Sequence, residues 1–187
     1  FAAMEALYEG QTNAPLIAIG LFGKPTTNGE MGNLKEEQFL TKIEIPNALS
    51  YMAFLKADAF VAGIKDLVLG NEAHGILSTK EKIHRGYEAQ QTLVEYKKAQ
   101  KNDPIKAQAL RAKFDDKVWM GQTFRYFGYG VYYNEDPAVL HANAFKTVPP
   151  VSLTFYAFHI MVGLGMHFLL LFVVILWLIY KNKLNNN

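Results

Sequence analysis

Three side chains near the end of the chain, His159, Met161 and His167, are of types that ligate heme iron. On a helix with 3.6 residues per turn, the two histidines lie about 80° apart around the axis but more than two turns apart along it, which does not suit two ligands of one metal. Met161 points about 200° away from His159. Gly165 and Phe168 lie beside it, and Gly163 and Gly165 leave room for a close neighbour, either another helix or a flat macrocycle. The spacing leaves both a packing role and a ligand role open for Met161.

Two carboxylates at the other end of the chain, Glu5 and Glu9, are the next candidates for chemistry. The segment FAAMEALYEG predicts the tail of a helix, because its apolar residues share one face and Gly10 supplies a C-terminal stop. Glu5 and Glu9 then share another face, since they are four positions apart. The pattern alone favours two solvated carboxylates.

The histidines and Met161 lie in a predicted membrane-spanning helix. No charged side chain occurs from Thr147 to Tyr180, a run well above the roughly 18 to 20 apolar positions that mark such a helix. Pro149 and Pro150 belong at its entrance, because proline is tolerated in a first turn and damaging further in. A helix from Ser152 to Tyr180 would be about 43 Å long, which fits a bilayer with its headgroup zones.

The ends of this helix predict its orientation. Trp177 and Tyr180 fall where interfacial aromatic residues belong, and Lys181 and Lys183 follow at once. Two lysines there, against Lys146 at the other end, place the C-terminus in the cytoplasm. The predicted parts of the chain are an extracytoplasmic region over 1–146, a transmembrane segment over 147–183 and a cytoplasmic polar tail over 184–187.

The region before the membrane helix reads as mainly helical with short strands. PLIAIGLFG, residues 15–23, is too short and too rich in glycine for a helix and indicates a buried strand or a tightly packed loop. KIEIP predicts a short strand ended by Pro46. Residues 47–70 predict a helix that Asn47 or Ser50 could cap.

A helical hairpin is predicted over about 79–120. The Ser-Thr-Lys-Glu sequence at 78–81 matches a capping box that opens a helix to about residue 100. Asp103 and Pro104 end this helix and start a second one, to about residue 120. So short a turn favours an antiparallel pair, with charged residues that are solvated and carry no chemistry. The tyrosines and glycines that follow suit the boundary between membrane and water, so this stretch is expected to lie on the membrane surface.

Composition excludes several classes of function. The formal charge is +2 and no basic patch is interleaved with aromatic residues, so nucleic acid is not an expected partner. The absence of cysteine from the sequence removes disulfides and thiolate metal sites. The chain begins with Phe1 and shows no signal peptide, so we expect it to be a fragment of a longer membrane protein.

Four segments resemble subunit I of the cytochrome bd quinol oxidases. VPPVSLTFYAFHIMVGLG, residues 148–165, resembles the family segment V-P-x-x-F-x-x-F-R-x-M-V-x-x-G. FAAMEALYEG resembles the start of the quinol-binding loop, with its A-A-x-E core, and IEIPNALSYMAF resembles a later I-P-x-x-L-S segment of that loop. FGYGVYY resembles the aromatic stretch before the helix. The segments occur in family order, so the chain is identified as the later part of the loop plus one transmembrane helix.

The resemblance implies roles for three residues. Met161 corresponds to the axial ligand of the low-spin heme b, whose other ligand is a histidine on an earlier helix. Glu5 corresponds to the loop glutamate of quinol oxidation, where its carboxylate could act as a general base. The accompanying loop lysine is expected just ahead of Phe1. His159 stands where the family has an arginine that helps to hold the heme, and a protonated histidine could still contact a propionate.

The resemblance also implies what the rest of the enzyme supplies. High-spin heme b and heme d would be ligated by other helices, so this segment alone should not reduce oxygen. The expected partners are subunit II, the remaining helices of subunit I and membrane lipid. The complete multi-pass enzyme would be a quinol:oxygen oxidoreductase of the bacterial cytoplasmic (inner) membrane. It would oxidise ubiquinol or menaquinol on the outer side and build a membrane potential.

Two other functions remain open from the residues themselves. One is a single-pass protein whose extracytoplasmic helical domain binds a partner, with Met161 as packing only. The other is a different membrane b-type cytochrome in which His159 or His167 is a ligand.

Overall fold

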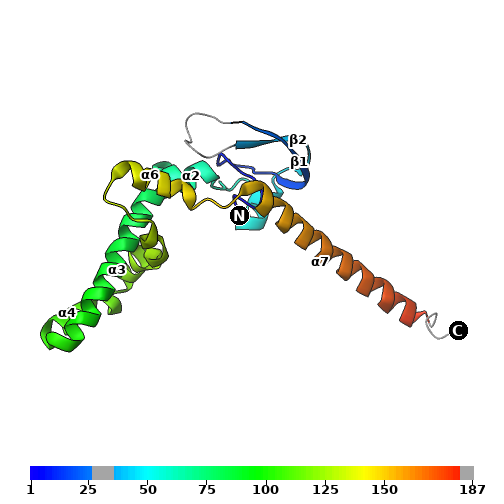
Figure 1. Cartoon of the computed structure of the whole chain (residues 1–187). Helices are drawn as coiled ribbons and strands as arrows, with labels where there is room; N and C mark the ends of the chain where they lie inside the picture. Colours follow the sequence, from blue (N-terminus) through cyan, green and yellow to red (C-terminus); the bar gives the residue numbers. More distant parts are fainter. Residues whose placement is uncertain (27–35, 182–187) are drawn as a thin grey trace.

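The computed structural model describes residues 1–26 and 36–181. It is mainly helical with a two-stranded sheet, as the sequence predicts. The sheet lies near the middle of an extended molecule (Figure 1). The long helices α3 (Thr79–Asn102) and α7 (Val151–Tyr180) leave this centre in different directions.

The N-terminal segment is not a helix, so the prediction for FAAMEALYEG is wrong. One turn begins, since the Met4 and Glu5 amides donate to the Phe1 carbonyl at 2.8 and 3.0 Å. The turn stops at Ala6, whose φ of 49° is left-handed and does not continue an α-helix. Ala2, Glu5 and Ala6 are buried. In a regular helix Glu5 and Glu9 would share one face. The structure instead buries Glu5 and leaves Glu9 exposed, so the packing of this segment overrides its helical pattern.

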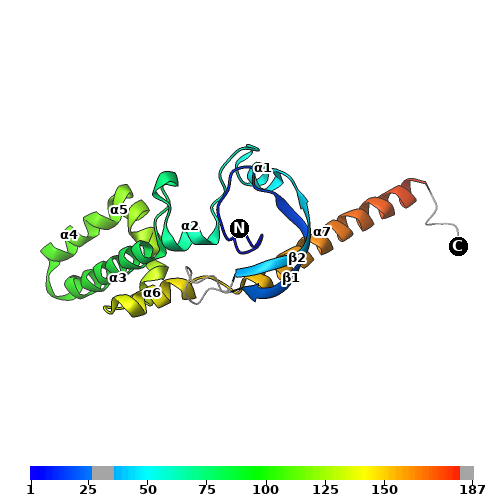
Figure 2. The ribbon, with the colours of Figure 1, turned by 90° about the horizontal axis from the view of Figure 1, so that it is seen from above.

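The two strands, β1 (Leu16–Thr26) and β2 (Glu36–Ile45), pair antiparallel, with Leu16 opposite Ile45. Both predicted strands are therefore present, and β2 ends directly before Pro46, as proposed. Only part of β1 is buried: Ile17 lies in the core while Ile19 and Leu21 are exposed. Seen from above, the sheet crosses the first turns of α7 (Figure 2).

Two short helices replace the single helix expected over 47–70. These are α1 (Ala48–Phe54) and α2 (Ile64–Leu69), and a short 3₁₀ turn η2 (Glu72–His74) follows. Asn47 precedes α1 in a left-handed conformation but makes no side-chain cap. Ser50 does not cap either, because its hydroxyl accepts from the Ala14 amide at 2.8 Å and donates to the Ala59 carbonyl at 2.7 Å. The Ser50 side chain therefore links the loop that contains Ala14 to the loop that contains Ala59.

The helical hairpin is confirmed, with a shorter second helix than predicted. Ser78 accepts from the Glu81 amide at 3.2 Å and opens α3. Asp103 accepts from the Lys106 amide at 3.0 Å and opens α4 (Pro104–Asp115). Asp116 interrupts the second helix and caps a separate helix, α5 (Lys117–Gln122). The Asp116 carboxylate accepts a hydrogen bond from the Val118 amide, and such a side-chain bond favours the start of a new helix over continuation of the old one.

The aromatic stretch forms a 3₁₀ segment, η3 (Phe124–Tyr132), which packs on α3. Its contact is closest at Gly86 and Gly130, where a Cβ added to Gly130 would lie 2.7 Å from the Gly86 carbonyl oxygen. Helix α6 (Pro137–Lys146) then leads to α7. The position of η3 at the membrane surface stays a prediction.

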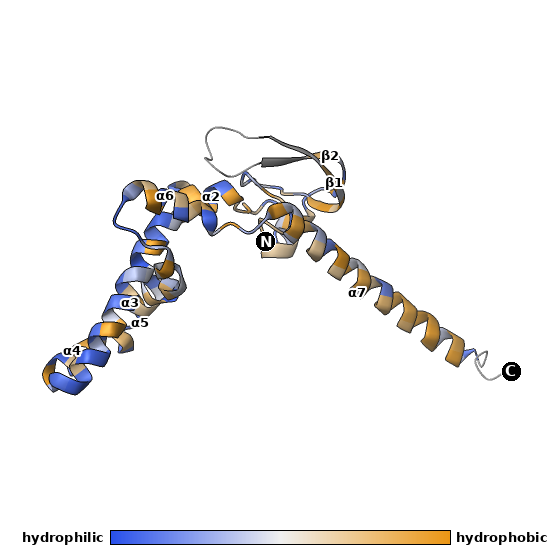
Figure 3. Ribbon diagram, in the orientation of Figure 1, coloured by the Kyte–Doolittle hydropathy of each residue, from blue (hydrophilic) through white to orange (hydrophobic). Residues whose placement is uncertain are grey.

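The predicted long apolar helix is present as α7. Within the described residues, the chain has one helical stretch long and apolar enough to cross a membrane, and its most apolar window is not buried within the protein. Figure 3 shows apolar residues along α7 and polar ones on α3 and α4. The predicted tail over 184–187 lies outside the described residues. The start of α7 enters the main core, whose buried residues are Ala2, Ala6, Ile17, Ile64, Val68, Phe145, Val151 and Phe155.

Candidate functional site

The first turns of α7 are fixed against the sheet by aromatic contacts. Phe155 is 1% exposed, and its ring lies 5.2 Å from Phe22 and 5.3 Å from Phe39. The Phe22 amide donates to the Tyr156 hydroxyl at 3.1 Å. These contacts hold β1 beside the helix that carries His159.

Glu5 lies in this core and is 2% exposed. Its Oε2 accepts from the Ile17 amide at 3.4 Å, while its buried Oε1 has no partner among the described residues. Burial raises the pKa of Glu5 above its ordinary value of 4.5, and the nearby His159 and the Ile17 amide act in the opposite sense. The prediction of two solvated carboxylates is thus wrong for Glu5. Glu9 is exposed and pairs with Lys65 at 2.6 Å.

His159 contacts Ile17, the residue whose amide donates to Glu5. Its Nε2 lies 2.5 Å from the Ile17 carbonyl oxygen, and its Nδ1 lies 2.9 Å from the Phe155 carbonyl oxygen. A carbonyl oxygen only accepts, and a neutral imidazole has a single N–H. Either neutral tautomer therefore donates one of the two hydrogen bonds, and both ring nitrogens lie within reach of a carbonyl oxygen.

Ile17 thus connects two of the three predicted site residues, although it is 142 positions from His159 in the sequence. The sequence did not identify Ile17, because it takes part through its backbone amide and carbonyl. Almost every residue type has these two groups, so the residue type gives no signal.

A surface pocket of about 340 Å³ borders Glu5. Its other lining residues include Tyr8, Ile17, Phe39, Lys42 and Leu49. Lys42 pairs with Glu44 at 2.7 Å. Glu5 is thus a buried acidic residue among the lining of a largely apolar hollow.

Met161 lies away from this cluster, further along α7, and is 61% exposed. Open space also faces Gly163 and Gly165, since a Cβ added at either would have no atom within 4 Å. Gly165 lies about 40° from Met161 around the helix and Gly163 on the opposite face, so the exposed thioether has one bare backbone position on its own side. His167 lies further along the same helix. No group of three or more His, Asp or Glu residues that could hold a metal ion occurs within 1–26 and 36–181.

Comparison with known proteins gives one family. The sequence model described as cytochrome bd terminal oxidase subunit I matches residues 1–186. No solved structure matches the chain.

Proposed function

The chain belongs to the cytochrome bd terminal oxidase subunit I family, and on this premise we propose that it oxidises quinol at Glu5 and helps to bind low-spin heme b through Met161. The family is one of oxidoreductases with heme cofactors and a multi-subunit assembly. The observation that supports the proposal most is the buried Glu5 carboxylate, with one unpaired oxygen, at the wall of an open pocket.

Glu5 would accept the proton of a quinol hydroxyl. A general base works best when its pKa lies near the working pH. Burial raises the pKa of Glu5, while a positive charge on His159 would favour the ionised form that the reaction needs. The ring of the quinol would lie against the apolar walls of the pocket, at Phe39 and Leu49.

Met161 would donate its sulfur to the iron of low-spin heme b. A heme bound there supplies a one-electron acceptor for the quinol site. Gly165, about 40° from Met161 around the helix, would let the macrocycle approach the backbone, because a side chain there would occupy that space.

His159 would supply the positive charge that the family arginine supplies. Its contacts with the Ile17 and Phe155 carbonyls engage both ring nitrogens, so it would act on a heme propionate through its charge. This propionate contact stays a prediction.

The remaining parts of the reaction belong to other segments. We propose that high-spin heme b and heme d, held elsewhere in subunit I, reduce oxygen, with subunit II as partner. Ubiquinol or menaquinol would be oxidised on the outer side of the bacterial inner membrane, where the region over 1–146 would lie.

The test compares Glu5→Gln with the exposed Glu9→Gln in the complete oxidase. We expect Glu5→Gln to lower quinol oxidation by at least about 10²-fold, which is the usual contribution of a general base. Activity with an artificial donor that bypasses the loop should be retained, and Glu9→Gln should behave as wild type. Equal loss with both donors in Glu5→Gln would show that the residue is structural.

A further inference from the structure

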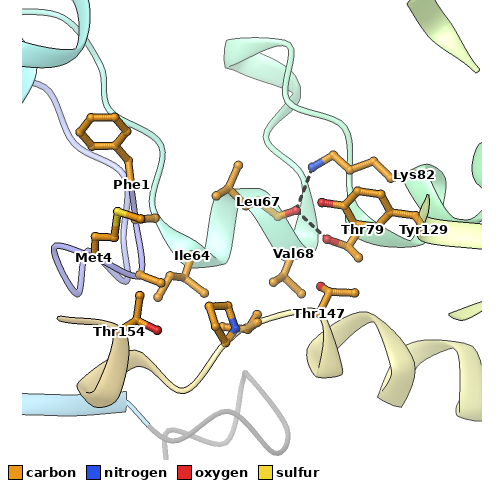
Figure 4. Close-up of a pocket in the computed structure, with 14 residues that line it drawn as sticks. Phe1, Met4, Ile64, Leu67, Val68, Thr79, Lys82, Tyr129, Thr147 and Thr154 are labelled. Carbon is orange, nitrogen blue, oxygen red and sulfur yellow. Dashed lines mark hydrogen bonds between the residues drawn. The ribbon is translucent and has the colours of Figure 1, made fainter. Parts of the chain in front are cut away.

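A second pocket, of about 290 Å³, lies where the N-terminal segment, α2, the start of α3, η3 and the start of α7 meet (Figure 4). Glu5 is not among the residues that line it. Phe1, Met4, Ile64 and Val68 form an apolar wall, and the polar groups of Thr79, Lys82 and Tyr129 gather at the other end. The pocket is therefore amphipathic, with a cation at its polar end.

Lys82 has donors to spare in this pocket. Its ammonium donates to the Leu67 carbonyl at 3.2 Å, and the Thr79 hydroxyl donates to the same oxygen at 2.9 Å. An ammonium group has three donors. No carboxylate forms an ion pair with Lys82 in the described part of the chain. A ligand with acceptor oxygens would satisfy the remaining N–H groups.

A second cation adjoins the first. Arg125 is exposed on η3 and lines a neighbouring hollow that shares Tyr129 and Thr147 with this pocket. Burial lowers the pKa of Lys82, and the positive charge of Arg125 lowers it further. Two like charges near each other repel, and an anion between them would turn this repulsion into attraction.

The pocket also lies at the start of the membrane helix. Thr147, Pro149 and Thr154 line it, and α7 begins at Val151. Because α7 is long and apolar enough to span a bilayer, its first turn is expected at the level of the lipid headgroups.

We propose that this pocket binds an anionic glycerophospholipid. The phosphate lies between Lys82 and Arg125, and part of an acyl chain lies along the apolar wall formed by Ile64 and Val68. A quinol is neutral and would leave the two cations without a counter-charge, so the charges favour the lipid. The proposal requires neither the quinol role of Glu5 nor heme ligation by Met161.

The test uses the complete oxidase in phosphatidylcholine nanodiscs that contain a trace of spin-labelled phosphatidylglycerol. Electron paramagnetic resonance measures the fraction of label immobilised by the protein. Lys82→Gln and Arg125→Gln should each lower the relative affinity for the label about fivefold, the effect of one basic residue near an anionic lipid. Lys80→Gln is the matched control, since Lys80 is exposed on the same helix and does not line the pocket. It should bind the label as wild type does.

Four outcomes would overturn the proposal. Unchanged binding of the label in both variants would exclude the site. If Lys82→Gln fails to fold, unchanged binding in Arg125→Gln alone would exclude it. Loss in Lys82→Gln alone would refute a phosphate between two cations. Displacement of the label by millimolar inorganic phosphate would make this a small-anion site, and displacement by a short-chain quinol would make it a quinol site.

Discussion

Replacement of Glu5 by leucine should make the loop region more stable at neutral and alkaline pH. Leucine has a similar size and no polar atoms. The substitution removes a buried oxygen without a partner, which costs about 1–3 kcal/mol. It also leaves the buried Ile17 amide without its acceptor, which costs about 1–3 kcal/mol as well, so the two terms nearly cancel while Glu5 is neutral. Once Glu5 is ionised the cost of its unpaired oxygen is larger, and the balance becomes a gain of about 1 kcal/mol.

The gain should depend on pH in a definite sense. The pKa of Glu5 is raised by burial, so between its ordinary value of 4.5 and the raised value the folded state binds more protons than the unfolded state. Stability of the wild type then falls as pH rises through this window. Leucine does not titrate, so the difference between Glu5→Leu and wild type should be small in acid and grow as pH increases.

Hydrogen exchange of the backbone amides of β1 is the suitable assay, since it reports local opening. A gain of about 1 kcal/mol slows exchange about fivefold. Glu9→Leu is the control, because Glu9 is exposed and a surface ion pair contributes about 0–1 kcal/mol. Faster exchange in Glu5→Leu at alkaline pH, or a difference that does not vary with pH, would refute the account of Glu5 as a destabilising buried acid.

Two further predictions concern α7. His159→Gln removes a positive charge that favours the ionised Glu5, so the pKa of Glu5 should rise further and the acid limb of the pH profile of quinol kcat/KM should move to higher pH. His159→Arg should restore the limb, and an unmoved limb in His159→Gln would contradict the link through Ile17. Met161→Ala should abolish the low-spin heme b signal in a reduced-minus-oxidised spectrum, while His167→Ala should retain it. The opposite pattern would favour a different b-type cytochrome with His167 as ligand.

Several features could be predicted because they depend on neighbours in the sequence. The hairpin follows from the caps at Ser78 and Asp103, whose side chains bond to amides three residues on. The strand ending before Pro46 follows from a residue without an amide hydrogen. The family resemblance identified Glu5, His159 and Met161 as candidate residues.

Two of the failures share one cause, which is burial against distant parts of the chain. The N-terminal segment has a helical pattern, but a left-handed Ala6 allows Glu5 to enter the core beside Ile17. Serine is a common helix cap, but the Ser50 hydroxyl bonds to the Ala14 amide and the Ala59 carbonyl instead of capping α1. Local pattern cannot report such contacts, because they are decided when the elements pack.

The sequence by itself determined that a helix ending at Tyr180 could cross a membrane, since the length and apolarity of a segment fix that property without any neighbour. Only the tertiary structure decided that Glu5 is buried and that His159 meets it through Ile17. The physical reason is that this meeting depends on the backbone of β1, whose amide and carbonyl groups are the same for every sequence. Their position beside α7 arises from the packing of Phe155 against the stacked rings of Phe22 and Phe39.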